Sequence, residues 1–206
     1  MGRYTGPSCK KCRRARVKLF LKGERCHGAK CAIEKRNFPP GIRALRPPKM
    51  SEYGKRLIEK QKLRFLYGVS ENQMRIYFAK ATRLKGITGH NLLSLFERRA
   101  DNVVFRMNLA KSRKQARQLI RHGLFKLNGK KIDIPSIILK TTDVLTFKDD
   151  KKAFFQPSVE VLKASGCPEW LMFNDKDSAV TVQADPSRDQ IDVAVEEQLI
   201  VEYYSK

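Results

Sequence analysis

The sequence lacks the long apolar runs that mark membrane proteins and the glycine-rich motifs that mark nucleotide-binding enzymes. No run of 18 apolar residues and no lipidation signal is present, so we expect no membrane partner. No GxGxxG or P-loop pattern occurs, and the three histidines and scattered aspartates suggest no catalytic pairing. We therefore expect a protein that is not an enzyme.

No apolar segment follows Met1, so we expect no signal peptide. We therefore expect the reducing environment of the cytoplasm, where cysteines bind metal more often than they form disulfides. The 206 residues contain no internal repeat or low-complexity run, and this length suits one or two domains with appendages.

Acidic residues are scarce over most of the chain. Residues 1–148 hold 37 Lys and Arg but only 9 Asp and Glu, a net charge of +28. Residues 149–206 carry a net charge of −6, which leaves the chain at +22. Because so many like charges repel one another, a polyanion is the expected partner of residues 1–148. Nucleic acid is favoured over an anionic membrane, since no strongly amphipathic basic helix stands at either end.

The five cysteines are unevenly placed, with four of them in the first 31 residues. They form the patterns Cys9-x-x-Cys12 and Cys26-x-x-x-x-Cys31, separated by a loop of 13 residues. Two short cysteine steps joined by a loop are typical of a structural zinc site, so we expect one Zn²⁺ held by four thiolates. Two disulfides, or a redox or metal-sensing use of the thiols, are the alternatives. Cys167 is most simply a small apolar residue.

Basic residues surround the cysteines and continue into a proline-rich stretch. The pairs Pro39-Pro40 and Pro47-Pro48 keep residues 37–49 out of helices and sheets, which predicts a linker. We expect the cations of both segments to lie along nucleic-acid phosphates. They are Lys10, Lys11, Arg13, Arg14, Arg36, Arg43, Arg46 and Lys49.

Three helical patterns follow, at 51–67, 70–86 and 89–107. Ser51 and Ser70 occupy N-cap positions, and apolar residues recur at steps of three and four, which predicts an all-helical subdomain. The apolar run 199–204 would be an aggregation liability in water. We therefore expect the C-terminus to pack on the helical subdomain.

A compact α+β unit is predicted next. Ser112 caps a short helix over 113–122, with Ala116, Leu119 and Ile120 on its inner face and Gly123 at its end. Strands at 124–127 and 130–135 flank Asn128-Gly129, the signature of a type I′ turn. Further strands are expected at 137–139, 144–147 and 179–182.

The short helix over 113–122 is the strongest nucleic-acid candidate. At about 100° per residue, Arg113, Lys114, Arg117 and Arg121 fall on one side, opposite the apolar face. We expect these four side chains to be exposed and to contact phosphates, a solvated basic face being the alternative. Lys130, Lys131, Arg98 and Arg99 are weaker candidates of the same kind, and local pairing of Arg99 with Asp101 or Glu97 is the alternative for that residue.

These segments together resemble the family of the bacterial small-subunit ribosomal protein number four, in its zinc-binding, four-cysteine form. The resemblance spans the whole chain. The motifs that carry it are Gly23-Glu24-Arg25-Cys26, Pro39-Pro40-Gly41, Ser51-Glu52-Tyr53-Gly54, Glu59-Lys60-Gln61-Lys62, Asn128-Gly129-Lys130 and residues 98–104, 116–119 and 199–205.

The resemblance implies an α+β protein in three parts. These are a zinc segment and basic linker at 1–45, a helical subdomain at 46–97 joined by 187–206, and an RNA-binding helix-plus-antiparallel-sheet domain at 98–186. It also implies RNA contacts by further residues, namely Tyr53, Lys55, Arg56, Lys60, Lys62 and Asn128. For Tyr53 and Tyr67, stacking on bases competes with ordinary helix packing.

The implied function is that of a structural component of the small ribosomal subunit. Such a protein binds small-subunit rRNA, nucleates assembly of the 5′ domain and lies beside other ribosomal proteins, near the channel where mRNA enters. It contributes to translational accuracy, and in some members it represses translation of its own mRNA. The alternative is an RNA-modifying or stress-related RNA-binding protein that shares the same module.

Overall fold

The structure is a computed structural model that describes residues 4–42, 49–175 and 177–205. The chain divides into two compact units, Met1–Leu92 with Val193–Lys206, and Leu93–Asp192. The boundary falls inside helix α5 (Thr88–Glu97). Within the described ranges, no helix is both long and apolar enough to cross a membrane.

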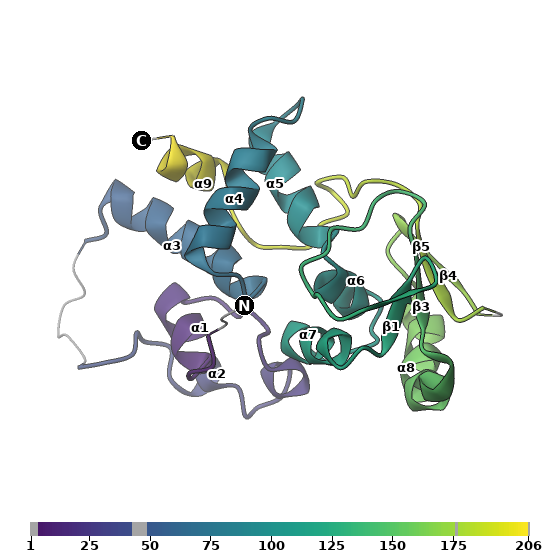
Figure 1. Cartoon of the computed structure of the whole chain (residues 1–206). Helices are drawn as coiled ribbons and strands as arrows, with labels where there is room; N and C mark the ends of the chain where they lie inside the picture. The colour runs from purple at the N-terminus through teal and green to yellow at the C-terminus, as the bar shows by residue number, and fades with distance from the viewer. Residues whose placement is uncertain (1–3, 43–48, 176, 206) are drawn as a thin grey trace. The chain divides into compact units, whose positions relative to one another are not determined.

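The first unit is helical (Figure 1). Ser51 and Ser70 cap two of its helices as predicted, because their hydroxyls accept hydrogen bonds from the backbone N–H groups of Gly54 and Gln73 at 3.2 and 3.3 Å. Besides the first part of α5, the helices of this unit are α1 (Cys9–Ala15), a 3-10 turn (Gly23–Cys26), α2 (Ala32–Lys35), α3 (Glu52–Leu66), α4 (Glu71–Ala81) and α9 (Glu197–Tyr204).

The C-terminal run folds as α9 and packs on α3, which confirms the expected docking of the C-terminus. Arg56 of α3 binds Glu202 of α9 at 2.7 Å. The hydroxyl of Tyr204 donates to Glu71 at 2.9 Å, so α9 is also tied to the start of α4. The phenol rings of Tyr53 and Tyr203 lie 5.7 Å apart.

The single helix predicted over 89–107 is wrong, because the chain forms α5 and then α6 (Ala100–Arg106). Arg99 between them is extended and pairs with Ile138 in an isolated antiparallel bridge. The backbone N–H groups of Leu139 and Ala100 donate to the carbonyls of Arg98 and Ile137 at 2.8 Å. This pairing interrupts the helix, and the strand predicted at 137–139 is reduced to the bridge.

The sheet of the second unit has five antiparallel strands in the order β2-β1-β3-β5-β4. Its hairpin is confirmed, since Asn128 and Gly129 both have positive φ, 48° and 81°. The strands are β1 (Phe125–Leu127), β2 (Lys130–Ile132), β3 (Val144–Phe147), β4 (Leu171–Asn174) and β5 (Ala179–Val182). The sequence patterns did not predict α8 (Lys152–Ser165), a helix that contains Pro157.

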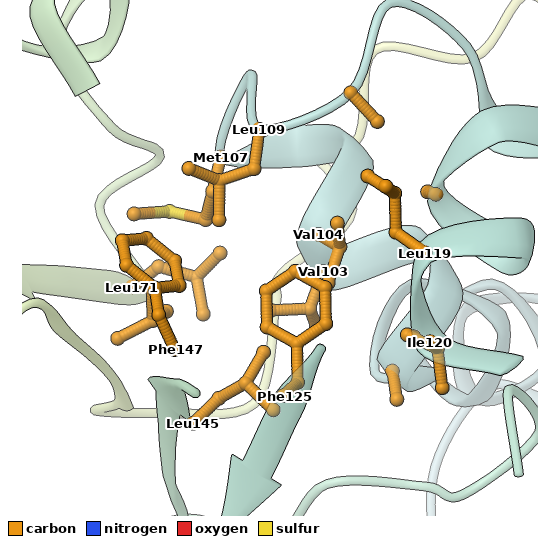
Figure 2. Close-up of a cluster of buried hydrophobic side chains, with 14 of the residues drawn as sticks. Val103, Val104, Met107, Leu109, Leu119, Ile120, Phe125, Leu145, Phe147 and Leu171 are labelled. Carbon is orange, nitrogen blue, oxygen red and sulfur yellow. The ribbon is translucent and has the colours of Figure 1, made fainter. Parts of the chain in front are cut away.

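One buried cluster joins α6, α7 (Arg113–Arg121) and the sheet (Figure 2). Val103 and Val104 of α6, Leu119 and Ile120 of α7 and Phe125 of β1 meet in it. Burying a side chain of this size is worth about 1.5–3 kcal/mol. The packing therefore fixes the orientation of α7, and with it the face that α7 presents to solvent.

Candidate nucleic-acid interface

The ends of α7 are fixed as the sequence predicts. The Ser112 hydroxyl accepts from the N–H of Gln115 at 3.3 Å, and the Gln115 side chain accepts from the N–H of Lys111 at 2.8 Å. Gly123 follows the helix with φ 68°, a conformation that favours glycine. Ala116, Leu119 and Ile120 are buried, so the predicted inner face is confirmed.

Arg117 and Arg99 are not exposed, which corrects the prediction for both. Arg117 is 8% and Arg99 1% exposed, and both bind the buried carboxylate of Asp101. Arg99 donates two hydrogen bonds of 3.0 and 2.8 Å to this carboxylate, and Nη1 of Arg117 lies 3.3 Å from Oδ2 of Asp101. A buried carboxylate needs such partners, because an unpaired charge is costly to bury. The alternative pairing of Arg99 with Asp101 is thus confirmed.

Arg113 also turns toward α6, so it does not extend a free basic ridge. Its Nε donates to the Asn102 side chain at 2.7 Å, and its guanidinium lies 4.4 Å from the centre of the Phe105 ring. Asn102 in turn donates to Glu97, which binds Arg106 through two hydrogen bonds of 2.8 Å. Arg113 and Arg117 therefore serve to hold α7 on α6.

The exposed face of α7 carries different residues. Lys114, Gln118 and Arg121 recur at steps of four and three, and all are exposed. Lys131 of β2 extends over Gly123 at the end of the helix, so closely that a Cβ on the glycine would lie 2.3 Å from Lys131 Cε. Because Lys130 is exposed beside it, the helix face and the hairpin together present four cations to solvent.

Two other residues of the second unit that were predicted to contact RNA, Arg98 and Asn128, bind side chains and backbone groups of the same unit. Arg98 forms an ion pair with Asp185. The Asn128 amide bridges the hairpin to β3, because its Oδ1 accepts from the N–H of Val144 and its Nδ2 donates to Asp143, both at 2.9 Å. The side chains of Arg98 and Asn128 thus help to hold the fold, a role that the sequence patterns did not predict.

The four N-terminal cysteines, Cys9, Cys12, Cys26 and Cys31, are free thiols and form no disulfide bond. Burial raises the pKa of the Cys12 thiol, the backbone N–H of Leu19 opposes that shift, and the charges of Cys26, Cys9 and Cys31 add to it. The N–H of Lys22 donates to Cys26 Sγ at 3.4 Å. In the described part of the chain, no three His, Cys, Asp or Glu side chains are already arranged to hold a metal ion.

The cations around the cysteines divide into two groups. Arg13 donates to the carbonyls of Phe38 and Pro39 at 2.9 and 3.3 Å, and the Lys11 ammonium lies 3.8 Å from the centre of the Phe65 ring. These two side chains hold the segment together. Of the other predicted contacts, Lys10, Arg14, Arg36 and Lys49 are exposed, whereas Arg43 and Arg46 lie outside the described residues.

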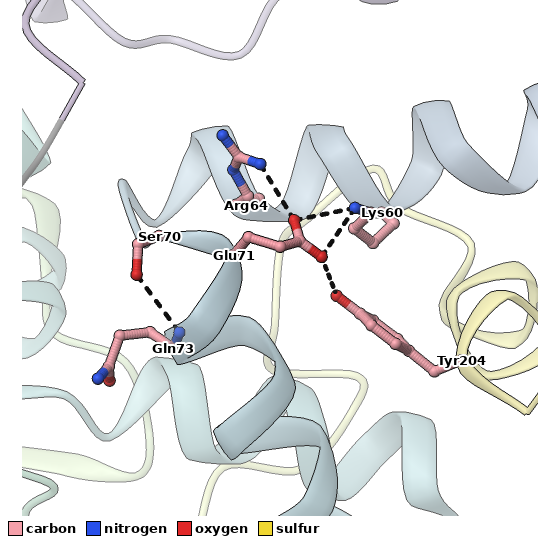
Figure 3. A network of polar contacts seen from close by, with 6 residues as sticks. All are labelled: Lys60, Arg64, Ser70, Glu71, Gln73 and Tyr204. Atoms are coloured by element: carbon pink, nitrogen blue, oxygen red, sulfur yellow. Dashed lines mark hydrogen bonds and ion pairs between the residues drawn. The ribbon is translucent and has the colours of Figure 1, made fainter.

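The cations of α3 have carboxylate partners within the first unit, which the sequence patterns did not predict. Lys60 is only 3% exposed and binds Glu71 at 2.9 Å, beside Arg64 at 3.0 Å (Figure 3). The other ion pairs are Lys55 with Glu52, Arg56 with Glu202 and Lys62 with Glu59. Tyr67 is buried, so it packs among the helices, whereas Tyr53 is exposed beside Tyr203.

A group of exposed cations was not selected from the sequence. They are Arg75 and Lys80 on α4 and Arg83 and Lys85 in the turn that follows. The signal that could have found them is a gap in acidic residues, since 72–96 contains no Asp or Glu.

Comparison with known families covers most of the chain. The family model "Ribosomal protein S4/S9 N-terminal domain" matches residues 3–97, and the model "S4 domain" matches residues 98–145. Small ribosomal subunit protein uS4 is 52% identical in Geotalea daltonii, 51% in Geobacter sulfurreducens and 47% in Thermodesulfovibrio yellowstonii, over 208 aligned residues and 100% of both chains in each case. The chain belongs to the uS4 family of small ribosomal subunit proteins.

Proposed function

We propose that this chain is a structural component of the small ribosomal subunit and binds small-subunit rRNA directly. The observation that carries the proposal is the division among the cations of α7. Arg113 and Arg117 fix the helix to α6, whereas Lys114 and Arg121 remain exposed. The uS4 family is one of ribosomal proteins that work in the cytoplasm and not of enzymes, so the exposed cations are binding groups.

RNA junctions suit such a surface. Where several RNA helices meet, their phosphate backbones repel one another, and cations held at fixed positions relieve that repulsion. The helix α7 is capped at both ends and packed on its inner face, so Lys114 and Arg121 stand on a rigid support. Lys130 and Lys131 extend this surface onto the hairpin. Shape and charge, more than base sequence, are therefore the features that the protein recognises.

The extent of the family match favours the ribosomal role over the alternative module-bearing proteins. An RNA-modifying enzyme or stress protein would carry the S4 domain beside a different domain, whereas here the ribosomal N-terminal domain precedes it. The finer roles follow from the same resemblance. They are nucleation of 5′-domain assembly, a place near the channel where mRNA enters, a contribution to accuracy and repression of the protein's own mRNA.

Cys9, Cys12, Cys26 and Cys31 would hold one structural Zn²⁺. The four thiols are free, the other three influence the Cys12 thiol, and backbone N–H groups already donate to Cys12 and Cys26. The N–H group of Leu19 opposes the rise in the pKa of the Cys12 thiol that burial causes, and N–H donors to sulfur are compatible with thiolate ligands. Bound zinc would supply a cross-link that the small apolar cluster of Cys12, Leu19, Cys31 and Ile33 lacks.

Competition between RNAs tests the proposed function. Full-length protein is bound to labelled small-subunit rRNA and challenged with either the unlabelled 5′ domain or a plain duplex of equal length. We expect the 5′ domain to compete at far lower concentration, and footprinting to place the protected nucleotides around a helix junction. If the duplex competes as well as the 5′ domain, the protein binds RNA only through non-specific electrostatic attraction, and the proposal is overturned.

A further inference from the structure

The two long helices of the first unit differ in how their cations are neutralised. On α3, the five cations Lys55, Arg56, Lys60, Lys62 and Arg64 all lie in ion pairs with glutamates. Glu71, which serves two of them, is the last acidic residue before Glu97. Each of these cations therefore has a carboxylate partner in the first unit, which reduces the net positive charge that α3 presents to another molecule.

The cations on α4 and in the turn after it are not neutralised by nearby carboxylates of the described chain. Arg75, Lys80, Arg83 and Lys85 are exposed, and among the residues that the structure describes none of the four has an ion-pair partner. The 25 residues 72–96 contain these four cations and no carboxylate. Since like charges so close together repel one another, this surface favours an anionic partner.

The exposed residues of α4 form one continuous face. Asn72, Ile76 and Ala79 follow at steps of four and three, with Arg75 and Lys80 beside them, and Arg83 in the turn comes four residues after Ala79. The small side chain of Ala79 lies between the cations and leaves room for a partner to approach the helix backbone. After α4 the chain continues through a turn to α5 (Figure 1). Lys85 lies in this turn.

We propose that this face, formed by Arg75, Ile76, Ala79, Lys80, Arg83 and Lys85, is a second RNA-binding surface. The inference rests on the proposed function and names a further contact region for the same RNA. RNA fits better than an acidic protein segment, because a phosphate backbone offers evenly repeated charge to a face with no carboxylate of its own. The exposed apolar residues Ile76, Leu84 and Ile87 suit the bases and sugars that a junction leaves unstacked.

Two matched lysine variants test the proposal in the full-length chain. Lys80→Gln removes a charge from the α4 face, and Lys55→Gln removes the same charge from α3, where Glu52 already neutralises it. Binding to small-subunit rRNA is measured over a range of salt concentrations. We expect Lys80→Gln to lower the magnitude of the log–log salt slope by about 0.7–0.9, which near 0.1 M salt is about a fivefold to eightfold loss of affinity.

The double variant Lys80→Gln with Arg83→Gln should lower the magnitude of the salt slope by about twice as much as Lys80→Gln alone. Lys55→Gln should leave the slope unchanged. Circular dichroism melts should match the wild type, since the altered side chains are exposed. A steep wild-type slope with unchanged α4 variants would overturn this inference alone, whereas a flat wild-type slope would overturn the proposed function as well. If the α4 variants bind rRNA normally but dissociate from assembled small subunits, the face binds an acidic protein instead. That result would overturn the RNA proposal.

Discussion

Arg117 of α7 donates to Asp101 of α6, with 3.3 Å between Nη1 and Oδ2, from inside the protein. Arg99 holds the same carboxylate through two shorter hydrogen bonds. The most basic helix of the domain thus uses part of its charge to fix its own position. Lys114 and Arg121 on its other face are exposed to solvent.

Arg117→Ala should destabilise the second unit, because it removes one partner of a buried carboxylate. Arg99 still satisfies Asp101, so we expect a loss of about 1.5–3 kcal/mol in the free energy of unfolding. Lys114→Ala, an exposed change on the same helix, should leave the unfolding transition nearly unmoved. Urea unfolding of both variants measures the difference. Equal stability of the two would contradict an internal role for Arg117.

Gly123→Ala should affect both stability and RNA binding. Its φ of 68° disfavours alanine by about 1–2 kcal/mol, and the new Cβ would displace the Lys131 side chain. Gly68→Ala is the matched control, since its φ is 64° and no atom lies within 4 Å of the new Cβ. Both variants should unfold more easily, but only Gly123→Ala should weaken binding to rRNA. The hypothesis that Lys131 contacts RNA fails if the two variants bind alike.

Glu71 should make the first unit sensitive to acid. Burial alone would raise the pKa of its carboxyl, but hydrogen bonds from Lys60, Tyr204 and Arg64 outweigh burial and lower the pKa below its ordinary value of 4.5. A lowered pKa in the folded state means that the stabilisation is present above pH 4.5 and is lost as the pH falls through the folded-state value.

Thermal unfolding between pH 7 and pH 3 checks this expectation. Glu71→Gln should be less stable than wild type at pH 7 and should lose less stability on acidification. Glu160→Gln, an exposed change in α8, controls for the loss of one carboxyl and should follow the wild-type curve. If Glu71→Gln and wild type lose stability in parallel, the Glu71 network does not cause the acid sensitivity.

The zinc proposal predicts one zinc per chain in purified protein. Cys9→Ser with Cys12→Ser should abolish the metal, whereas Cys167→Ser, outside the set, should retain it. Because the segment has little core of its own, chelation should unfold residues 1–35 and leave 98–148 folded in hydrogen exchange. Absence of zinc, or disulfides in cytosolic protein, would count against the site. Reversible thiol oxidation without metal would favour the redox alternative.

Local patterns were sufficient where local forces decide the structure. Ser112 and Gly123 delimit α7, and Asn128-Gly129 turns the hairpin, because caps and type I′ turns depend on a few neighbouring residues. No helix was predicted at the position of α8, where Pro157 by itself disfavours one. Its apolar residues Phe155, Val159 and Leu162 follow helical spacing and pack into the core nonetheless.

Long-range pairing decided what the patterns missed. The break at Arg99 depends on Ile138, 39 residues away, and the inward turn of Arg117 depends on Asp101, 16 residues away. A helical projection separates an apolar face from a basic one, but it does not show which cations meet a carboxylate from another element. The same reason explains why α3 resembled an RNA contact while its charges are paired.

The salt dependence of rRNA binding by an α7 double variant tests the central claim most directly. Lys114→Gln with Arg121→Gln removes two exposed charges, and Lys148→Gln with Lys163→Gln removes two charges that already pair with Asp150 and Asp175 in the same unit. The α7 variant should lower the magnitude of the log–log slope by about 1.4–1.8, and the control should keep the wild-type slope. Identical slopes for wild type and both variants would contradict RNA binding by the exposed face of α7.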